Sequence, residues 1–218
     1  MSELTNAIEL DPYGFPMVWT ESVQASVHWL PLTKLQFERF MCRHPQRRFH
    51  DGWYQDVCGL NKRVSPQQVG PGNYWCAFAS GLLPSEGQAF QRSCGDDYFL
   101  PSIDEWRRAC DEWKAKPPMP ENWFQEFGLT ELVSTLFRRL HRVAADPTLR
   151  GEESQAKQMF FEQGVVEWVR NDDPAQPWVG QGRPNKAFNS RMSNPVIVLN
   201  SETARLKDFG VRLMRRPS

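Results

Sequence analysis

Apolar residues recur at three- and four-residue spacing in several parts of the chain, and this pattern predicts helices. The clearest example is Leu129–Ala145, where the spacing gives one continuous apolar face. A second helix is predicted over Thr33–Cys42, with Thr33 as its N-cap. A third follows Ser102, because Ser102 and Glu105 have the spacing of a capping box. A fourth is predicted over Asn73–Leu83, which offers apolar side chains for burial.

Other apolar runs are too short for helices and predict strands. The run Val27–Leu32 reads as a short strand with an edge or a bend at Pro31. After Gln163, Gly, Pro and Asn residues separate short runs such as VVEWV and PVIVL, which is typical of short strands and long loops. The mixture predicts an α+β fold, and 218 residues suit a single domain that covers 1–218.

The charge balance limits the kinds of partner. The chain has 26 Lys plus Arg and 26 Asp plus Glu, so no net field attracts nucleic acid or an anionic membrane. No apolar run approaches the roughly 20 residues of a membrane span, and the N-terminus does not resemble a signal peptide. We therefore expect a soluble cytoplasmic protein, with neither a membrane nor nucleic acid as a direct partner.

The cysteines and histidines do not form a recognisable metal motif. The five cysteines are dispersed without a CxxC pair, and we expect buried thiols in a reducing cytosol rather than a zinc site. His44, His50 and Asp51 allow a weak facial-triad hypothesis, although a polar surface loop explains them more simply. No P-loop, dinucleotide fingerprint, GxSxG or HExxH motif is present.

An acidic cluster near residue 170 permits two interpretations. Glu167, Asn171, Asp172 and Asp173 carry oxygens that suit a hard cation. A turn stabilised by Asx contacts is the simpler interpretation, and we favour it.

Several short motifs occur in a characteristic order. They are LTKLQFERF at Leu32–Phe40, FLPSIDEWRRAC at Phe99–Cys110, GVVEWV at Gly164–Val169 and GVRLMR at Gly210–Arg215, with a looser match around Trp75 and Cys76. Taken together they resemble the formylglycine-generating enzyme family, also called the sulfatase-modifying-factor domain. The resemblance covers roughly residues 25 to 216 and implies a C-type-lectin-like fold with short strands and long loops.

The matched residues have structural roles under this resemblance. Trp106 is expected to fill the core, and Glu167 is expected to accept backbone hydrogen bonds beneath it. The segment 114–158 replaces a loop of the family and is expected to be a helical insertion.

The departures from the family bear on activity. The resemblance places two copper-binding cysteines in the C-terminal quarter, whereas this chain has none after Cys110. The segment Val179–Arg191 lacks them, and Gly164 stands where the family has a calcium-binding Asn. The histidine pattern of the iron-dependent branch is also missing. The resemblance thus implies an inactive member that needs no cofactor.

A binding role is therefore our first hypothesis: a protein- or peptide-binding module, as a subunit of a larger bacterial assembly. The expected binding residues come from the loop that matches the lost active site, and they are Trp178, Arg183, Asn185, Lys186, Asn189 and Arg191. A second expected surface is the basic part of the inserted helix, with Arg138, Arg139 and Arg142.

An enzyme with a rebuilt active site is the alternative hypothesis. It would be a metal-dependent oxidoreductase of the same superfamily that uses the acids of 167–173. Its site could instead be formed by convergence of His28, His44 and His50.

Overall fold

The computed structural model has an α+β architecture, which confirms the predicted class, and its two sheets are open rather than closed into a barrel. It describes residues 8–44, 65–69, 77–116, 118, 131–145, 165–182, 196–197, 201–203, 205–206 and 208–217. The described helices are α1 (Lys34–Arg43), α3 (Pro84–Cys94), α4 (Ile103–Ala115) and α6 (Glu131–Ala145). Two short 3-10 segments are η1 (Glu21–Val23) and η2 (Pro66–Gln68).

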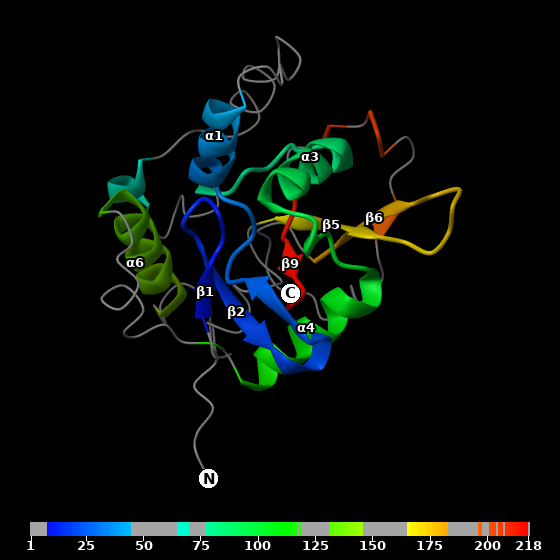
Figure 1. Ribbon diagram of the computed structural model, residues 1–218, viewed down its shortest axis with the longest axis horizontal. Coiled ribbons are helices and arrows are strands. Elements are labelled where there is room, and N and C mark those ends of the chain that lie inside the picture. Colours follow the sequence, from blue (N-terminus) through cyan, green and yellow to red (C-terminus); the bar gives the residue numbers. More distant parts are fainter. Residues whose placement is uncertain are drawn as a thin grey trace.

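The first sheet is antiparallel and joins the beginning of the chain to its end. Its strand order is β1 (Ile8–Leu10), β2 (Pro16–Thr20), β3 (Ala25–His28), β9 (Met214–Arg215) and β4 (Tyr98–Phe99). In the view of Figure 1, α1 and α3 lie toward one end of this sheet and α4 toward the other. The C-terminal strand is thus held between residues from two distant parts of the sequence.

The second sheet contains the strand of the GVVEWV motif. Its order is β7 (Val196–Ile197), β6 (Trp178–Gln181), β5 (Val166–Arg170) and β8 (Phe209–Gly210). The pair β5 and β8 is parallel, and the other pairs are antiparallel. This arrangement places Val166 beside Phe209 and so brings the GVVEWV and GVRLMR motifs together.

Three of the predicted helices are confirmed, and two of them begin with the expected caps. At α1, Thr33 Oγ1 accepts from the Gln36 N–H at 3.2 Å, and the Gln36 side chain accepts from the Thr33 N–H at 2.8 Å. Ser102 and Glu105 make the equivalent pair at α4, at 3.2 and 2.8 Å. These reciprocal bonds satisfy N–H groups that a helix start leaves unpaired.

The prediction of a helix over Asn73–Leu83 is wrong for its described part, 77–83. The N–H groups of Gly81 and Leu82 donate to Phe209 O, and the Ala79 N–H donates to Leu32 O, so this backbone bonds to other segments. Gly81 has φ 82° and Leu83 is extended before Pro84. The helix begins at Pro84 instead.

The strand predicted over Val27–Leu32 is partly wrong, because β3 ends at His28. The chain bends over Trp29–Pro31, as expected at Pro31. There the N–H groups of Trp29 and Leu32 donate to Pro16 O and Val211 O, outside the regular ladder.

Helix α6 packs on the main core. Its buried face carries Val133, Leu136, Phe137 and Leu140. The Phe137 ring lies 5.4 Å from Trp29 and 5.5 Å from Phe15 between centroids. The described part of 114–158 therefore shares one hydrophobic core with the sheets. None of the described helices is both long and apolar enough to cross a membrane.

Candidate functional site

Glu167 on β5 lies at the centre of a buried polar cluster. The residue is 1% exposed. Its carboxylate accepts from Trp106 Nε1 at 2.8 Å, from Arg212 Nη2 at 2.8 Å and from Arg212 Nε at 3.0 Å. Among the described residues, the donors to Glu167 are side chains rather than the backbone groups that we expected. The indole of α4 and the guanidinium before β9 are long enough to reach a carboxylate in the core.

Arg212 is fully buried and links this carboxylate to the first sheet. Its Nη1 donates to His28 O at 2.8 Å and to Trp29 O at 3.0 Å, at the end of β3. Its Cζ lies 5.8 Å from the centre of the Trp113 ring. The guanidinium therefore donates hydrogen bonds to β5 and to the end of β3, and it also lies near the Trp113 ring of α4.

The buried ion pair of Glu167 and Arg212 is stabilised by hydrogen bonds within the protein rather than by water. Burial raises the pKa of Glu167, and the positive charge and hydrogen bonds of Arg212 and the Trp106 hydrogen bond oppose that rise. Burial likewise lowers the pKa of Arg212, and Glu167 opposes that change. A buried ion pair offsets its desolvation only when its polar atoms are bonded, as they are here. Glu167 therefore has a structural role in the core.

Trp168, the neighbour of Glu167, has an equally structural position. Its Nε1 donates to Leu82 O at 2.7 Å, and its ring lies 4.4 Å from that of Phe209. This bond satisfies the carbonyl of the irregular segment before α3 and keeps the indole within the core.

A second buried carboxylate, Asp11, organises the loop before β2. Its Oδ1 accepts from the N–H groups of Tyr13 and Phe15, both at 2.8 Å. Its Oδ2 lies 3.1 Å from Gln36 Nε2 and 3.1 Å from His28 Nε2. His28 Nδ1 is buried without a hydrogen-bond partner among the described residues.

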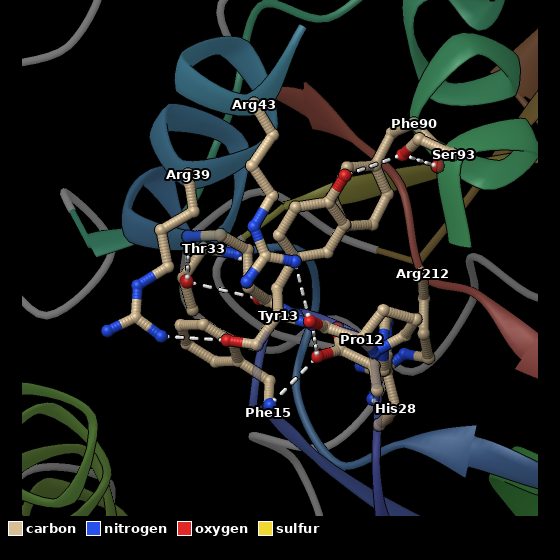
Figure 2. Close-up of polar contacts among 12 residues, drawn as sticks. Pro12, Tyr13, Phe15, His28, Thr33, Arg39, Arg43, Phe90, Ser93 and Arg212 are labelled. Atoms are coloured by element: carbon tan, nitrogen blue, oxygen red, sulfur yellow. Dashed lines mark hydrogen bonds and ion pairs between the residues drawn. The ribbon is translucent and has the colours of Figure 1, made fainter. Parts of the chain in front are cut away.

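Two arginines of α1 hold the same loop from outside. Figure 2 shows Arg39 and Arg43 extending from the helix toward residues 12–15. Arg39 donates to Tyr13 O at 2.7 Å and Arg43 donates to Pro12 O at 2.8 Å. The Arg43 Cζ lies 4.7 Å from the centre of the Tyr13 ring, whose hydroxyl donates to Ser93 Oγ at 2.9 Å. The loop is thereby fixed between α1 and α3.

Sequence reasoning did not find Asp11. The turn composition of DPYG was a usable signal, since an Asp before such a turn commonly binds backbone N–H groups. The partnership with His28, 17 residues away, depends on the pairing of β2 with β3 and has no local signal.

The acidic turn after β5 contains the Asx contacts of the simpler interpretation, a stabilised turn. Asp173 Oδ1 accepts from the Ala175 N–H at 2.9 Å, and Asn171 Nδ2 donates to Gln176 O at 3.0 Å. Glu167 points away from this turn into the core. In the described ranges, no three His, Cys, Asp or Glu side chains come together as a metal site.

The histidines predicted to converge have separate environments where they are described. His28 is buried against Asp11, whereas His44 caps the end of α1 beside Phe40. His50 and Asp51 lie outside the described residues.

The expected binding residues are described only in part. Trp178 is 6% exposed, which places its ring in the core rather than on the surface. Arg138 and Arg139 are exposed on α6, and Arg142 belongs to the same helix. The remaining predicted residues lie outside the described part of the chain, and they are Arg183, Asn185, Lys186, Asn189 and Arg191.

The cysteines fit the expectation of buried thiols at two of the three described positions. Cys94 and Cys110 are buried, but Cys42 is exposed on α1. Burial strongly raises the pKa of Cys94, which disfavours its reactive thiolate.

Comparison with known proteins assigns no relative. No model of a known protein family matches this chain, and no curated protein matches it.

Proposed function

We propose that this chain is a divergent formylglycine-generating-enzyme-like domain with a C-type-lectin-like fold, that it has lost catalysis, and that it binds a protein or peptide. The observation that supports this proposal best is the meeting of three motifs at one buried point. Trp106 comes from FLPSIDEWRRAC, Glu167 from GVVEWV and Arg212 from GVRLMR. Motifs chosen only by resemblance are not expected to contact one another, so their meeting in one hydrogen-bonded cluster supports a common structural frame.

The chemistry of the cluster favours a structural role. Glu167 is held by Trp106 and Arg212 and has almost no access to solvent. The sequence has no cysteine after Cys110, where the resemblance would place the copper ligands. A thiolate centre of the family's type is therefore not available in that part of the chain.

Binding is assigned to residues that do not belong to these three motifs. Residues 183–191 lie between β6 and β7 in the sequence, and Arg138 and Arg139 are exposed on α6. A rigid core that carries variable loops is a common arrangement in recognition domains. By analogy with such domains, the partner is a protein of a larger bacterial assembly.

A capture experiment tests this assignment. The tagged chain is used as bait in a lysate of its native host, and captured proteins are identified by mass spectrometry. The double variant Arg183→Ala/Arg191→Ala is expected to lose a partner that the parent retains, with a melting temperature within a few degrees of the parent. Arg138→Ala/Arg139→Ala tests the second surface, and Arg92→Ala, an exposed arginine of α3, is the control.

Metal content separates this proposal from the oxidoreductase alternative. The purified chain is analysed for copper, iron and calcium. The binding proposal expects no stoichiometric metal. One equivalent of a transition metal per chain, or capture that is unchanged in both double variants, would contradict it.

A further inference from the structure

A groove of about 420 Å³ lies at one end of the first sheet. The antiparallel order places the start of β1, the end of β2, the start of β3 and the end of β9 at this end. Figure 1 shows β1 and β2 side by side, with the C-terminus close to β9. The groove is thus built from both ends of the chain.

Four residues that line the groove have their side chains on one face of the sheet. Trp19 of β2 pairs with Ser26 of β3, and Ser26 pairs with Arg215 of β9. Glu9 of β1 pairs with Met17, two residues before Trp19, so Glu9 lies on the same face. Glu9 and Trp19 are therefore diagonal neighbours on adjacent strands, which is close enough for one small ligand to contact both.

The charged side chains of this face disfavour a charged ligand of either sign. Arg215 donates to both Asp97 and Glu9, so its guanidinium lies between two carboxylates. A cation at Glu9 would approach that guanidinium, and an anion would approach the two carboxylates. The next residue, Arg216, also lines the groove, but its side chain lies on the opposite face, with Cζ 4.7 Å from the centre of the Phe99 ring. The groove therefore suits a neutral ligand.

Trp19, Ser26 and Glu9 have contacts that such a ligand can fill. The indole is half-buried, and its Nε1 donates to Glu21 at 3.0 Å, which restricts the orientation of the ring. Ser26 is 7% exposed, and its hydroxyl has no hydrogen-bond partner among the described residues. Arg215 donates to Oε2 of Glu9, while Oε1 has no partner in the part of the chain that the structure describes. A ligand that bonds to the nearly buried hydroxyl recovers the free energy of an unmade hydrogen bond.

We propose that this groove binds a small neutral nitrogen heterocycle of about the size of a nucleobase. The flat ring packs against Trp19, an N–H group of the ligand donates to Oε1 of Glu9, and the Ser26 hydroxyl bonds to a ring nitrogen. The volume lies near the lower end of the roughly 300–1,000 Å³ found for ligand pockets, which favours one or two fused rings. This proposal does not rest on the function proposed above, because its residues differ from those assigned to the partner there.

The test uses adenine as the probe. It is titrated into ¹⁵N-labelled protein, and the indole N–H resonance of Trp19 is followed after assignment with Trp19→Phe. Saturable shifts are expected with a dissociation constant in the millimolar range or below. A matched probe, 6-dimethylamino-9-methylpurine, retains the rings without N–H donors and is expected to bind about tenfold more weakly, because the hydrogen bond to a charged acceptor is lost.

Matched variants locate the N–H contact. Glu9→Gln replaces a charged acceptor by a neutral one and is expected to weaken adenine binding about fivefold, with little effect on the dimethylamino probe. Asp97→Asn is the control, because Asp97 also accepts from Arg215 but is not among the described residues that line the groove. It should leave adenine binding unchanged. Ser26→Ala is expected to weaken binding a few-fold. Far-UV circular dichroism verifies that each variant is folded.

Three results would overturn the proposal. They are the absence of a Trp19 shift up to about 5 mM adenine, equal binding of the two purines, and equal effects of Glu9→Gln and Asp97→Asn. A further arm uses two charged aromatic probes, benzoate and benzamidinium, and each is expected to bind more weakly than adenine. If either binds more tightly than adenine, the groove selects a charged ligand and the assignment of a neutral one is wrong.

Discussion

Asp11 and Glu167 are both buried carboxylates, but they organise the molecule at different ranges. Asp11 accepts two backbone N–H groups from its own loop, two and four residues away. Within the described part of the chain, Glu167 accepts only side-chain donors, from Trp106 and Arg212, which are 61 and 45 residues distant. Asp11 therefore shapes a loop and anchors it to α1, whereas Glu167 joins segments that the sequence keeps far apart.

The two carboxylates also differ in how their charge is compensated. Glu167 faces the guanidinium of Arg212, so the loss of either partner leaves a buried charge without its counter-charge. Asp11 instead accepts from the N–H groups of Tyr13, Phe15 and Gln36 and contacts the His28 ring, so its loss leaves several polar groups without a hydrogen-bond partner. This difference predicts unequal costs for equivalent substitutions.

The largest effect is expected for Glu167→Ala. The substitution leaves Arg212 buried and unpaired and removes the acceptor of Trp106, which should lower the free energy of unfolding by about 3–5 kcal/mol. Urea denaturation followed by circular dichroism measures this change. Asp172→Ala, in the exposed turn after β5, is the control and should cost less than about 0.5 kcal/mol. Similar costs for the two variants would contradict the assigned role of Glu167.

A smaller effect is expected for Asp11→Ala. Several hydrogen-bond donors lose their acceptor, so the expected cost is about 2–3 kcal/mol. Asp11→Asn retains an oxygen for the N–H groups of Tyr13 and Phe15 and should cost less. Hydrogen exchange at those two amides provides a local readout, with faster exchange expected in Asp11→Ala than in the parent. If Asp11→Ala is more costly than Glu167→Ala, the comparison is wrong.

Glu105, a half-buried carboxylate, should show the smallest effect, and this effect depends on pH. Burial acts to raise its pKa, but the N–H and hydroxyl groups of Ser102 and the charges of Arg170 and Arg216 outweigh burial, so the pKa is lowered. Its stabilising contribution is therefore present above the unfolded pKa of about 4.3 and is lost as the pH falls through the folded value.

The variant Glu105→Gln isolates that charge, because glutamine preserves the capping box. At pH 7 the parent should be more stable than the variant by about 0.2–1 kcal/mol, and the difference should shrink as the pH falls below the unfolded pKa of about 4.3. Chemical denaturation at several pH values measures it. A difference that grows on acidification would have the wrong sign.

Local patterns were sufficient to predict much of the fold. The caps at Thr33 and Ser102 and the apolar stripe of Leu129–Ala145 predicted three helices because each signal is local in the sequence. Helix α3 was missed, although Pro84 at its start and Gly95 after its end are typical boundary residues. Its packing face includes Gly87, where an added Cβ would lie 2.6 Å from Val211, so this close contact needs the absence of a side chain.

The site was less predictable, because its partners come from different elements. The importance of Trp106 and Glu167 was visible in the motifs, but the identity of the bonding groups depended on where Arg212 lies in the folded chain. Trp178 was expected at a binding surface because of its residue type, but pairing within the second sheet buries it.

The most direct test of the account is a double-mutant cycle between Glu167 and Arg212. The free energy of unfolding is measured for the parent, Glu167→Gln, Arg212→Met and the double variant. We expect a coupling of about 2–3 kcal/mol, because the double variant removes both charges while each single variant leaves one unpaired. Additivity within about 0.5 kcal/mol would show that the two residues act independently and would contradict the proposal that they join the three motifs into one frame.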